Sequence, residues 1–469
     1  MAVLLIILHL IGFLSSIRAL FTARTSPASI AWIVSLNTFP YVAVPAYWLF
    51  GHSKFQGYVT ARSNKDTRLA NIIRSKYEHA GPFIYQPDIS DHTLSAPQNL
   101  AKMPFTEANS LSLLIDGDET FQSIFEGIES AQSYILVQFY IVRDDNLGRE
   151  LKDSLIQKAR QGVSVFFLYD ALGSHKLPLS YINELLKEGV QINKFSSSRG
   201  LLKSFQINFR NHRKIVVADG KHGWVGGLNI GDEYLRGIKR LGPWRDTHLK
   251  ISGPAVLGLQ ISFLEDWYWA TDEIPELNWI PSAPVDIGSP CLIIPSGPAD
   301  RFDTASLMIQ HMINTARERL WVSSPYFVPD EGVMAALKLA AFRGVDVRVL
   351  IPEKPDHMLV YYAAYAFIGS LIDADIKVYR YNQGFLHGKA FLVDDKYCGI
   401  GTVNLDNRSF RLNFEITALM KDSSFARELE QMFIGDFLRS RSMNKDDISV
   451  KPLWFRTLSR AAYLTAPIL

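Results

Sequence analysis

A motif that occurs twice constrains this chain more than any other feature of its sequence. The pattern His-x-Lys-x4-Asp is written as His212, Lys214 and Asp219 and again as His387, Lys389 and Asp394. In both copies an Asn follows ten residues after the Asp, as Asn229 and Asn404. A random chain of this composition would hold at most about 0.1 copies of the pattern. Two copies with matching tails therefore indicate a duplicated unit.

Each copy of the motif has the pattern of a β-hairpin. Short apolar runs, residues 214–218 and 389–393, end at the turn signals Asp219-Gly220 and Asp394-Asp395, and a second short run follows. Side chains two residues apart on a strand point to the same face. Each copy is therefore expected to present one imidazole and one ammonium group to a common surface.

The duplication extends well beyond the motifs. Strand, helix and strand patterns occupy residues 131–140, 147–159 and 162–170, and the same series recurs over 316–326, 333–341 and 344–351. The offset between the copies falls from 185 residues (Val137 to Val322) to 175 (His212 to His387), as a few loop deletions would produce. This spacing predicts an α/β fold with βαβ units in a largely parallel sheet. Two αβα half-domains related by a pseudo-twofold axis would bring both hairpins to one site.

Two apolar runs precede the repeat, at residues 2–17 and 30–50. The second is long enough to cross ~30 Å of hydrocarbon, so we expect two transmembrane helices that form a hairpin. A cleaved signal peptide and buried helices of a soluble protein are the alternatives; the missing basic segment at the start argues against the first. Arg18 and Arg24 lie between the runs, whereas Lys54, Arg62, Lys65 and Arg68 follow them. The positive-inside rule then places the large C-terminal part of the chain in the cytoplasm.

These patterns divide the chain into five expected segments: two transmembrane helices (1–50), a linker or peripheral segment (51–105), the first half of the repeat (106–285), the second half (286–445) and an amphipathic tail (446–469). In the tail, Leu453, Trp454, Leu458 and Ala462 can share one side of a helix, and Lys451, Arg456 and Arg460 supply positive charge. Such a helix lies on an anionic membrane surface or docks on the folded domain.

Charge and cysteine content exclude some classes of protein. The 469 residues carry a formal net charge of +2, which gives no sign of a nucleic-acid partner. The two cysteines, Cys291 and Cys398, lack the spacing of metal ligands, which suits a reducing compartment and argues against a zinc site built on cysteine.

The paired motifs suit a phosphodiester substrate. Two lysine ammonium groups can offset the charge on the non-bridging oxygens, and Asn229, Asn404 and the Thr402 hydroxyl can donate hydrogen bonds to them. With imidazoles on opposite sides of phosphorus, one attacks in line and the other protonates the leaving oxygen, through a covalent phosphohistidine. The lysines supply the countercharge of a metal ion, so we expect neither a metal nor another cofactor.

Other residues are expected to support the histidines. Each imidazole needs a partner on its second ring nitrogen: Glu415 lies 28 residues after His387, and Asp246 lies 34 after His212. Asp219 and Asp394 sit at the turns, so bracing of the hairpin is favoured over contact with substrate. His248 starts a third His-x-Lys without the Asp, and we interpret it as non-catalytic. Tyr140 and Tyr326 end strands where a site would open. Each could belong either to the core or to the site.

The motifs together resemble the phospholipase D superfamily, and the whole arrangement is similar to that of bacterial cardiolipin synthases. The resemblance covers nearly the full chain and rests on the two motifs, on Gly226-Gly-Leu-Asn-Ile-Gly-Asp232 and Gly401-Thr-Val-Asn-Leu-Asp406, on Leu412-Asn-Phe-Glu415, and on the N-terminal hairpin and C-terminal tail. The Gly-Ser that follows the motif in the superfamily is Gly226-Gly227 in one copy and Gly401-Thr402 in the other. Only the second copy therefore offers a hydroxyl.

The resemblance implies a transferase that condenses two phosphatidylglycerols to cardiolipin and glycerol, with His212 as nucleophile and His387 as acid and base. It implies phosphatidylglycerol and anionic lipids as partners, and an oligomer is possible. A hydrolytic phospholipase D that forms phosphatidic acid, a membrane-tethered nuclease of the same superfamily, and an inactive scaffold are the alternatives.

Overall fold

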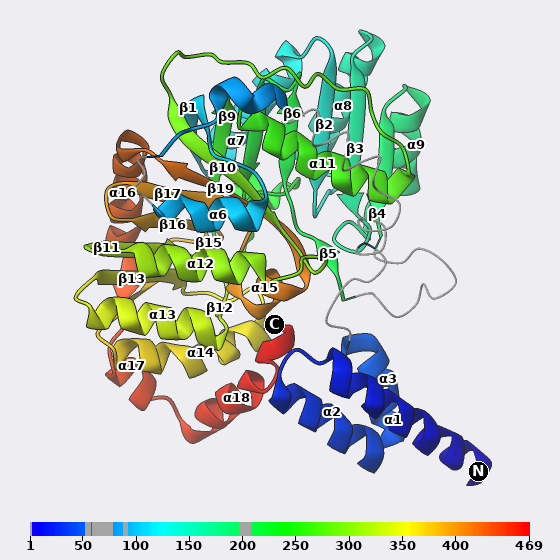
Figure 1. Cartoon of the computed structure of the whole chain (residues 1–469), viewed down its shortest axis with the longest axis vertical. Coiled ribbons are helices and arrows are strands. Elements are labelled where there is room, and N and C mark those ends of the chain that lie inside the picture. The colour runs from blue at the N-terminus through cyan, green and yellow to red at the C-terminus, as the bar shows by residue number, and fades with distance from the viewer. Residues whose placement is uncertain (1, 52–57, 59–77, 88–91, 197–207) are drawn as a thin grey trace.

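A long mixed sheet forms the centre of the molecule in the computed structural model, which describes residues 2–51, 58, 78–87, 92–196 and 208–469 (Figure 1). The first half comprises β1 (Thr106–Ile115), α7 (Asp116–Ser130), β2 (Tyr134–Phe139), α8 (Asn146–Arg160), β3 (Ser164–Asp170), α9 (Leu179–Lys187), β4 (Gln191–Phe195), β5 (Arg210–Asn211), β6 (Ile215–Ala218), β7 (His222–Gly226), α10 (Glu233–Arg236), β8 (Trp244–Arg245), β9 (Thr247–Ser252) and α11 (Val256–Thr271).

The second half repeats this order with few changes. It comprises β10 (Ser289–Ser296), α12 (Thr304–Thr315), β11 (Arg319–Ser323), β12 (Phe327–Val328), α13 (Glu331–Phe342), β13 (Asp346–Pro352), α14 (Met358–Ile372), β14 (Lys377–Tyr381), β15 (Phe385–Leu386), β16 (Ala390–Val393), β17 (Tyr397–Gly401), β18 (Leu405–Asp406), α15 (Asn407–Arg411), β19 (Asn413–Lys421), α16 (Ser423–Leu438) and β20 (Ser440–Ser442).

The order of strands in the sheet is symmetric about its middle. β1 and β10 pair with each other, with Thr106 opposite Cys291. Outward from β1 the strands are β9, β7, β6, β2, β3 and β4; outward from β10 they are β19, β17, β16, β11, β13 and β14. Equivalent strands of the repeat thus occupy equivalent places on the two sides. The expected α/β fold with two halves related by a pseudo-twofold axis is confirmed.

The expectation of a largely parallel sheet is wrong. Among the described strands of this sheet, parallel pairing is confined to β2, β3 and β4, to their counterparts β11, β13 and β14, and to the two-residue β5 beside β19. The motif hairpins β6–β7 and β16–β17 and the β1–β10 junction are antiparallel. Parallel pairs need long crossovers, which α8, α9, α13 and α14 supply, whereas the three-residue turns of the hairpins permit only antiparallel pairs.

One buried cluster joins the two halves. It contains Val256 and Leu259 of α11 in the first half together with Leu429 and Phe433 of α16 in the second. A separate core lies beneath α7, α8 and α9, and another beneath α12, α13 and α14. Since the shared core buries apolar surface from both halves, it fixes their mutual arrangement and everything that lies between them.

The N-terminal region differs from the expected pair of spanning helices. α1 (Ala2–Thr22) is the one helix of the described residues that is long and apolar enough to cross a membrane. The second apolar run is divided into α2 (Ser26–Thr38) and α3 (Pro40–Phe50). Pro40 has no N–H to continue the first helix and disfavours the helical conformation at Phe39, which has φ −132° and ψ 56°. A second continuous span is therefore not confirmed.

The remaining segments pack on the second half. Within residues 51–105, η1 (Glu78–Phe83), η2 (His92–Leu94) and α6 (Ser95–Ala101) are described, and Leu94 and Phe105 belong to the core of the second half. The rest of this expected linker, apart from Tyr58 and residues 51, 84–87 and 102–105, lies outside the described residues. At the other end, α17 (Asp446–Ser449), α18 (Leu453–Tyr463) and η3 (Ala466–Ile468) follow β20, and α18 packs on α14.

Candidate active site

Both motifs lie on the expected hairpins. β6 pairs with β7 around the turn at Asp219, where Ala218 lies opposite His222, and β16 pairs with β17 around Asp394, where Val393 lies opposite Tyr397. Each histidine and lysine comes just before the first strand of its hairpin, at the end far from the turn. All four residues are at least nine-tenths buried, with His212 the most exposed at 9%.

Two short strand pairs bring each histidine against the opposite half. β5, which precedes His212, runs parallel to β19 of the second half, and the His212 N–H donates to the Phe414 carbonyl at 2.8 Å. β15, which precedes His387, runs parallel to β8 of the first half, and the His387 N–H donates to the Arg245 carbonyl at 2.7 Å. The backbone at both histidines is therefore held across the pseudo-twofold axis.

The carboxylate partners of the imidazoles are crossed between the halves. His212 Nδ1 lies 2.9 Å from Glu415 Oε2, and His387 Nδ1 lies 2.7 Å from Asp246 Oδ2. In the sequence each carboxylate follows the histidine of its own half. In the structure each carboxylate pairs with the histidine of the opposite half. Nδ1 of each ring faces a buried carboxylate, and no described residue hydrogen-bonds either Nε2. Nε2 is thus the nitrogen left for the substrate.

Burial decides the protonation of the two imidazoles. It lowers the pKa of His212 to about 4, with Lys214 and Lys389 acting in the same direction and Glu415 opposing them. The pKa of His387 also falls to about 4 through burial and then Lys389, against Asp246. Because Lys389 acts on His212 and Lys214 acts on His387, these groups from both halves share one electrostatic environment. Both rings are neutral at pH 7 in the empty site, with an Nε2 lone pair exposed.

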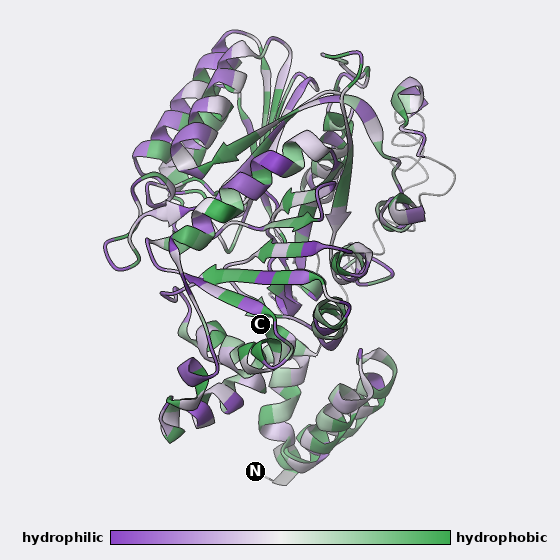
Figure 2. Ribbon diagram, turned by 90° about the vertical axis from the view of Figure 1, so that its left-hand side faces the viewer, coloured by the Kyte–Doolittle hydropathy of each residue, from purple (hydrophilic) through white to green (hydrophobic). Residues whose placement is uncertain are grey.

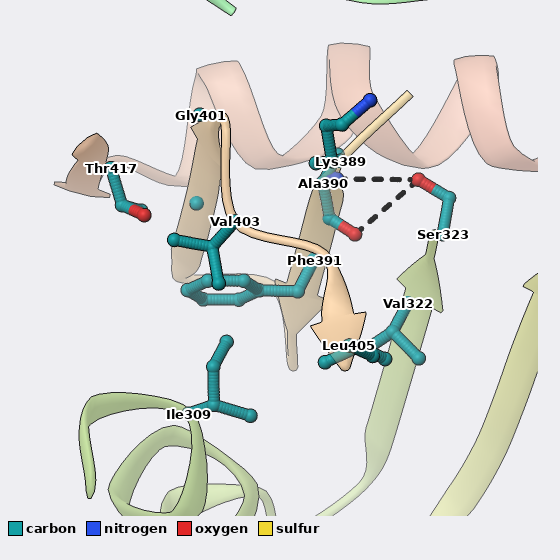
Figure 3. A pocket seen from close by; sticks show the side chains of 11 residues that line it. Ile309, Val322, Ser323, Lys389, Ala390, Phe391, Gly401, Val403, Leu405 and Thr417 are labelled. Carbon is teal, nitrogen blue, oxygen red and sulfur yellow. Dashed lines mark hydrogen bonds between the residues drawn. The ribbon is translucent and has the colours of Figure 1, made fainter. Parts of the chain in front are cut away.

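The two lysines are held by their own motifs. Lys214 Nζ donates to the His212 carbonyl at 2.6 Å, and Lys389 Nζ donates to that of His387. Burial lowers the pKa of Lys214 to about 7 and that of Lys389 to about 8. Figure 3 shows Lys389 pointing away from an apolar cluster that contains Phe391, Val403 and Leu405. An anion at this site would therefore meet two poorly hydrated cations.

The two carboxylates remain charged despite complete burial. Burial alone would raise the pKa of Glu415, but His212, Lys214 and the Thr402 hydroxyl bring it below the ordinary value. Burial likewise opposes ionisation of Asp246, and Lys389 and His387 lower its pKa well below the ordinary value. An ionised carboxylate on Nδ1 holds the neutral ring as the Nδ1–H tautomer and stabilises the imidazolium that forms when Nε2 takes a proton or phosphorus.

The side chains expected to hold phosphate oxygens are only partly free. The Thr402 hydroxyl donates to Glu415 Oε2 at 2.5 Å and accepts from the Ile416 N–H, so it positions the carboxylate instead. Both ends of the Asn229 amide are engaged, with the Ile141 N–H and the Tyr234 hydroxyl. In the empty site these two side chains therefore hydrogen-bond the protein itself. The Asn404 Oδ1 atom is buried without a hydrogen-bond partner among the described residues.

Asp219 and Asp394 hold the far ends of the hairpins. Asp219 accepts hydrogen bonds from the N–H groups of Gln132, Ser133 and Tyr134, which begin β2. Asp394 accepts from those of Arg317, Glu318 and Arg319 before and at the start of β11. Both residues adopt positive φ, 53° and 54°. These hydrogen bonds give Asp219 and Asp394 a bracing role in the hairpins.

Replacing Asp219 by Ala is expected to lower the free energy of unfolding by roughly 1–3 kcal/mol, because three N–H groups, of which that of Tyr134 is buried, lose their acceptor. Asp219→Asn keeps one carboxamide oxygen and tolerates positive φ, so its loss should be smaller. Chemical unfolding gives the stabilities, and turnover per folded molecule should stay within a few-fold of the parent. Normal stability with abolished turnover in Asp219→Asn would instead place the carboxylate in the chemistry.

Aromatic rings flank both imidazoles, and the sequence indicated only some of them. The Tyr140 ring meets His212 edge-on at 5.1 Å, and the Trp244 ring lies 5.1 Å from that of His387. The Tyr326 hydroxyl instead donates a hydrogen bond to Asp356 at 2.5 Å. The signal for Trp244 was its place two residues before Asp246. His248 is buried near the site, yet no described carboxylate bonds its ring, as its non-catalytic interpretation requires.

The described residues contain no group of three or more His, Cys, Asp or Glu side chains placed to hold a metal ion. The cationic groups at the site are those of Lys214 and Lys389, and their Nζ atoms are held by carbonyl oxygens of the histidines. The site is thus arranged around protein cations.

A half-domain present twice, with a His-Lys pair from each copy at one shared site, defines a protein with phospholipase D-like domains. A family model described as "Cardiolipin synthase, PLD-like domain" matches residues 124–239 and 309–437. The chain belongs to the cardiolipin synthase family, which confirms the resemblance seen in the motifs. Membership implies association with membranes, for which α1 is the candidate span.

Relatives resemble the chain over its whole length. A protein named cardiolipin synthase A from Pseudomonas putida is 47% identical over 471 residues, which cover 99% of this chain and 97% of the relative. One of the same name from Pseudomonas aeruginosa (strain LESB58) is 46% identical over 473 residues, 100% and 96% of the two chains. The solved phosphatidylserine synthase of Haemophilus influenzae Rd KW20 shares the fold, with a TM-score of 0.60 at 17% identity over 81% of this chain and all of that one.

Proposed function

We propose that this chain is a cardiolipin synthase that transfers a phosphatidyl group from one phosphatidylglycerol to a second, with release of glycerol. The observation that carries the proposal is the pair of crossed dyads, His212 with Glu415 and His387 with Asp246. Two equivalent acid–base groups from two sides suit a reaction in which one alcohol leaves phosphorus and another alcohol enters.

The first step forms a covalent intermediate. His212 Nε2 attacks phosphorus, the bond from phosphorus to the glycerol oxygen breaks, and His387 gives that oxygen a proton. The low pKa of His212 keeps its lone pair free at neutral pH. His387 must arrive protonated, and the negative charge of the bound phosphodiester raises its pKa from the value in the empty site. Glu415 then faces the phosphoimidazolium, and the lysines face the non-bridging oxygens.

The second step reverses the first with a new alcohol. The primary hydroxyl of a second phosphatidylglycerol gives its proton to His387 and attacks phosphorus, and the bond to His212 Nε2 breaks. Cardiolipin leaves, and His212 is restored. One phosphodiester has replaced another, so the balance needs no nucleotide. Water in place of the lipid alcohol would give phosphatidic acid, so the outcome depends on which acceptor reaches the site.

The setting we propose for this reaction is the inner membrane of a bacterium, with the two halves in the cytoplasm. Phosphatidylglycerol and other anionic lipids are the partners, and self-association is possible. α18 docks on the second half through Phe455, Ser459 and Ala462, which are buried. Leu453, Trp454 and Leu458 stay exposed on another side, with Arg456 and Arg460 beside them. We propose that this apolar side lies on the bilayer while the buried side of α18 docks on the second half.

The experiment uses phosphatidylglycerol labelled in its head-group glycerol and the full-length protein in anionic liposomes. Each cardiolipin retains one head-group glycerol and releases one, so we expect the label to divide equally between cardiolipin and free glycerol. Phosphatidic acid with all converted label in glycerol would identify a hydrolase, and no turnover would favour a scaffold. A chelator should leave the rate unchanged, and a strong loss would contradict the role given to the lysines.

A further inference from the structure

The three N-terminal helices pack in a register that makes α2 and α3 a V-shaped pair. The Ser29 hydroxyl of α2 donates to the Ala19 carbonyl of α1, and a Cβ on Gly12 would lie 2.3 Å from the Leu36 carbonyl oxygen. α2 therefore runs antiparallel to α1. On α3, the Tyr47 hydroxyl lies 3.2 Å from that of Thr22. α3 thus returns along α1 to the end from which α2 departed.

Neither arm of this pair is long enough to cross a bilayer. α2 has 13 residues and α3 has 11, which at 1.5 Å per residue gives about 20 Å and 17 Å against ~30 Å of hydrocarbon. α1, with 21 residues, reaches about 32 Å. Gly12, near the middle of α1, faces the point where α2 and α3 meet. The tip of the V therefore reaches only about halfway along the spanning helix.

The tip meets the requirement that hydrocarbon places on polar groups. Asn37 Nδ2 donates to the Ile33 carbonyl at 2.7 Å, and the Thr38 hydroxyl donates to that of Val34 at 2.8 Å. The Phe39 N–H donates to the Ser35 carbonyl, and Pro40 has no N–H to satisfy. Groups inside a bilayer must find partners within the protein. The Asn37 amide nitrogen, the Thr38 hydroxyl and the Phe39 N–H already have such partners.

The open end of the V is attached to the catalytic halves. Arg24, in the turn between α1 and α2, lies 3.4 Å from Asp303 and donates to the Arg411 carbonyl at 3.1 Å. Arg411 also bonds Asp303 at 3.0 Å. In Figure 1 this end of α1 adjoins the C-terminal part of the chain, and the N-terminus lies at the other end. The turn at Arg24 is therefore on the same side of the membrane as the active site.

We propose that the chain crosses the membrane once, through α1, and that α2 and α3 form a re-entrant hairpin that enters and leaves at the cytoplasmic face. The occupant of its outer surface is lipid: Ile30, Val34 and Val42 are 56–65% exposed and apolar, and Figure 2 shows these helices largely in the hydrophobic colours. The N-terminus then lies outside the cell. This proposal rests on the cytoplasmic placement of the catalytic halves given above.

Charge distribution favours this arrangement over two spans. With two spans, Arg18 and Arg24 would be outside, against four basic residues that follow inside. With the re-entrant hairpin, all six lie on the cytoplasmic side, and residues 1–17 contain no Lys or Arg. The positive-inside rule counts such residues near the ends of a span. One crossing satisfies it without exception.

Single cysteines in the full-length protein test the proposal. Val3→Cys and Ser26→Cys are labelled with a membrane-impermeant maleimide in spheroplasts, before and after the membrane is opened, and Phe39→Cys also after detergent. We expect Val3→Cys to react from outside, Ser26→Cys only after opening, and Phe39→Cys only in detergent. The parent protein is the control, since Cys291 and Cys398 are buried.

Reaction of Ser26→Cys from outside with protection of Val3→Cys would establish two spans and overturn the proposal. Reaction of Phe39→Cys from outside would do the same, and an N-terminus shortened beyond Val3 in the mature protein would show that α1 is a cleaved signal. Cardiolipin formation is measured on each variant separately. If the cysteines are labelled as expected but no cardiolipin forms, the result would contradict the proposed synthase function and still support the single-span topology.

Discussion

His212→Ala and His387→Ala are each expected to lower cardiolipin formation by about 10³-fold or more, because each removes either the nucleophile or the group that moves the proton. The initial rate of cardiolipin formation in liposomes is the measurement. His222→Ala is the matched control, since this partly exposed histidine on β7 bonds only the Ser252 hydroxyl, so its rate should match the parent. Substantial activity in either site variant would end the paired-histidine mechanism.

The same variants separate the two roles. With labelled phosphatidylglycerol, the parent should carry a trace of phosphatidyl group on His212 after rapid quenching, found by peptide mass. His212→Ala should carry none, whereas a trapped group on His387 would reverse the assignment. The near symmetry of the two dyads makes this measurement necessary, because geometry alone gives both imidazoles a carboxylate on Nδ1 and an open Nε2.

Glu415→Gln and Asp246→Asn are each expected to lower turnover by about 10²- to 10⁴-fold, since an amide no longer holds the reactive tautomer or stabilises the imidazolium. Crossed pairing gives a sharper expectation. In protein with labelled histidine nitrogens, Glu415→Gln should shift the Nδ1 proton resonance of His212, and Asp246→Asn that of His387. Glu430→Gln, on α16, is the matched control, because this carboxylate pairs with Arg319 at the start of β11.

The opposite assignment of shifts would show that each carboxylate serves the histidine of its own half, contrary to the structure. Unchanged resonances with normal turnover would remove both carboxylates from the site. Circular dichroism on each variant checks that the fold persists, because Glu415 and Asp246 are completely buried and their loss of charge also changes packing.

Much of this architecture could be predicted from local patterns. The hairpins follow from short β-branched runs that end at Asp219 and Asp394, and the helices α8 and α13 from their apolar periodicity. The duplication itself predicted the pseudo-twofold axis. The sheet was misjudged because the βαβ pattern covers only three strands in each half, while the hairpins and the β1–β10 junction add antiparallel pairs.

The site was harder to predict because its decisive contacts are long-range. Crossing of the carboxylates depends on β5 and β8, strands of two residues that pair with the opposite half and carry no periodic signal. The hydrogen bond from Thr402 to Glu415 depends on the pairing of β17 with β19, which brings these two side chains together. By contrast, Pro40 is a sequence signal for the helix break between α2 and α3. The apolar composition of residues 30–50 nevertheless favoured one continuous span.

The crossed dyads make each half chemically incomplete. Alone, either half would carry an imidazole without its carboxylate and a carboxylate without its imidazole. An ancestor made of one half could therefore have acted only as a homodimer, with both dyads identical by symmetry. Joining the two copies in one gene lifts that constraint: a Cβ at Gly227 would lie 2.0 Å from Asp246 Oδ1, while its counterpart Thr402 binds Glu415. Gene fusion thus allowed the entering and leaving alcohols to be served by two unlike sides.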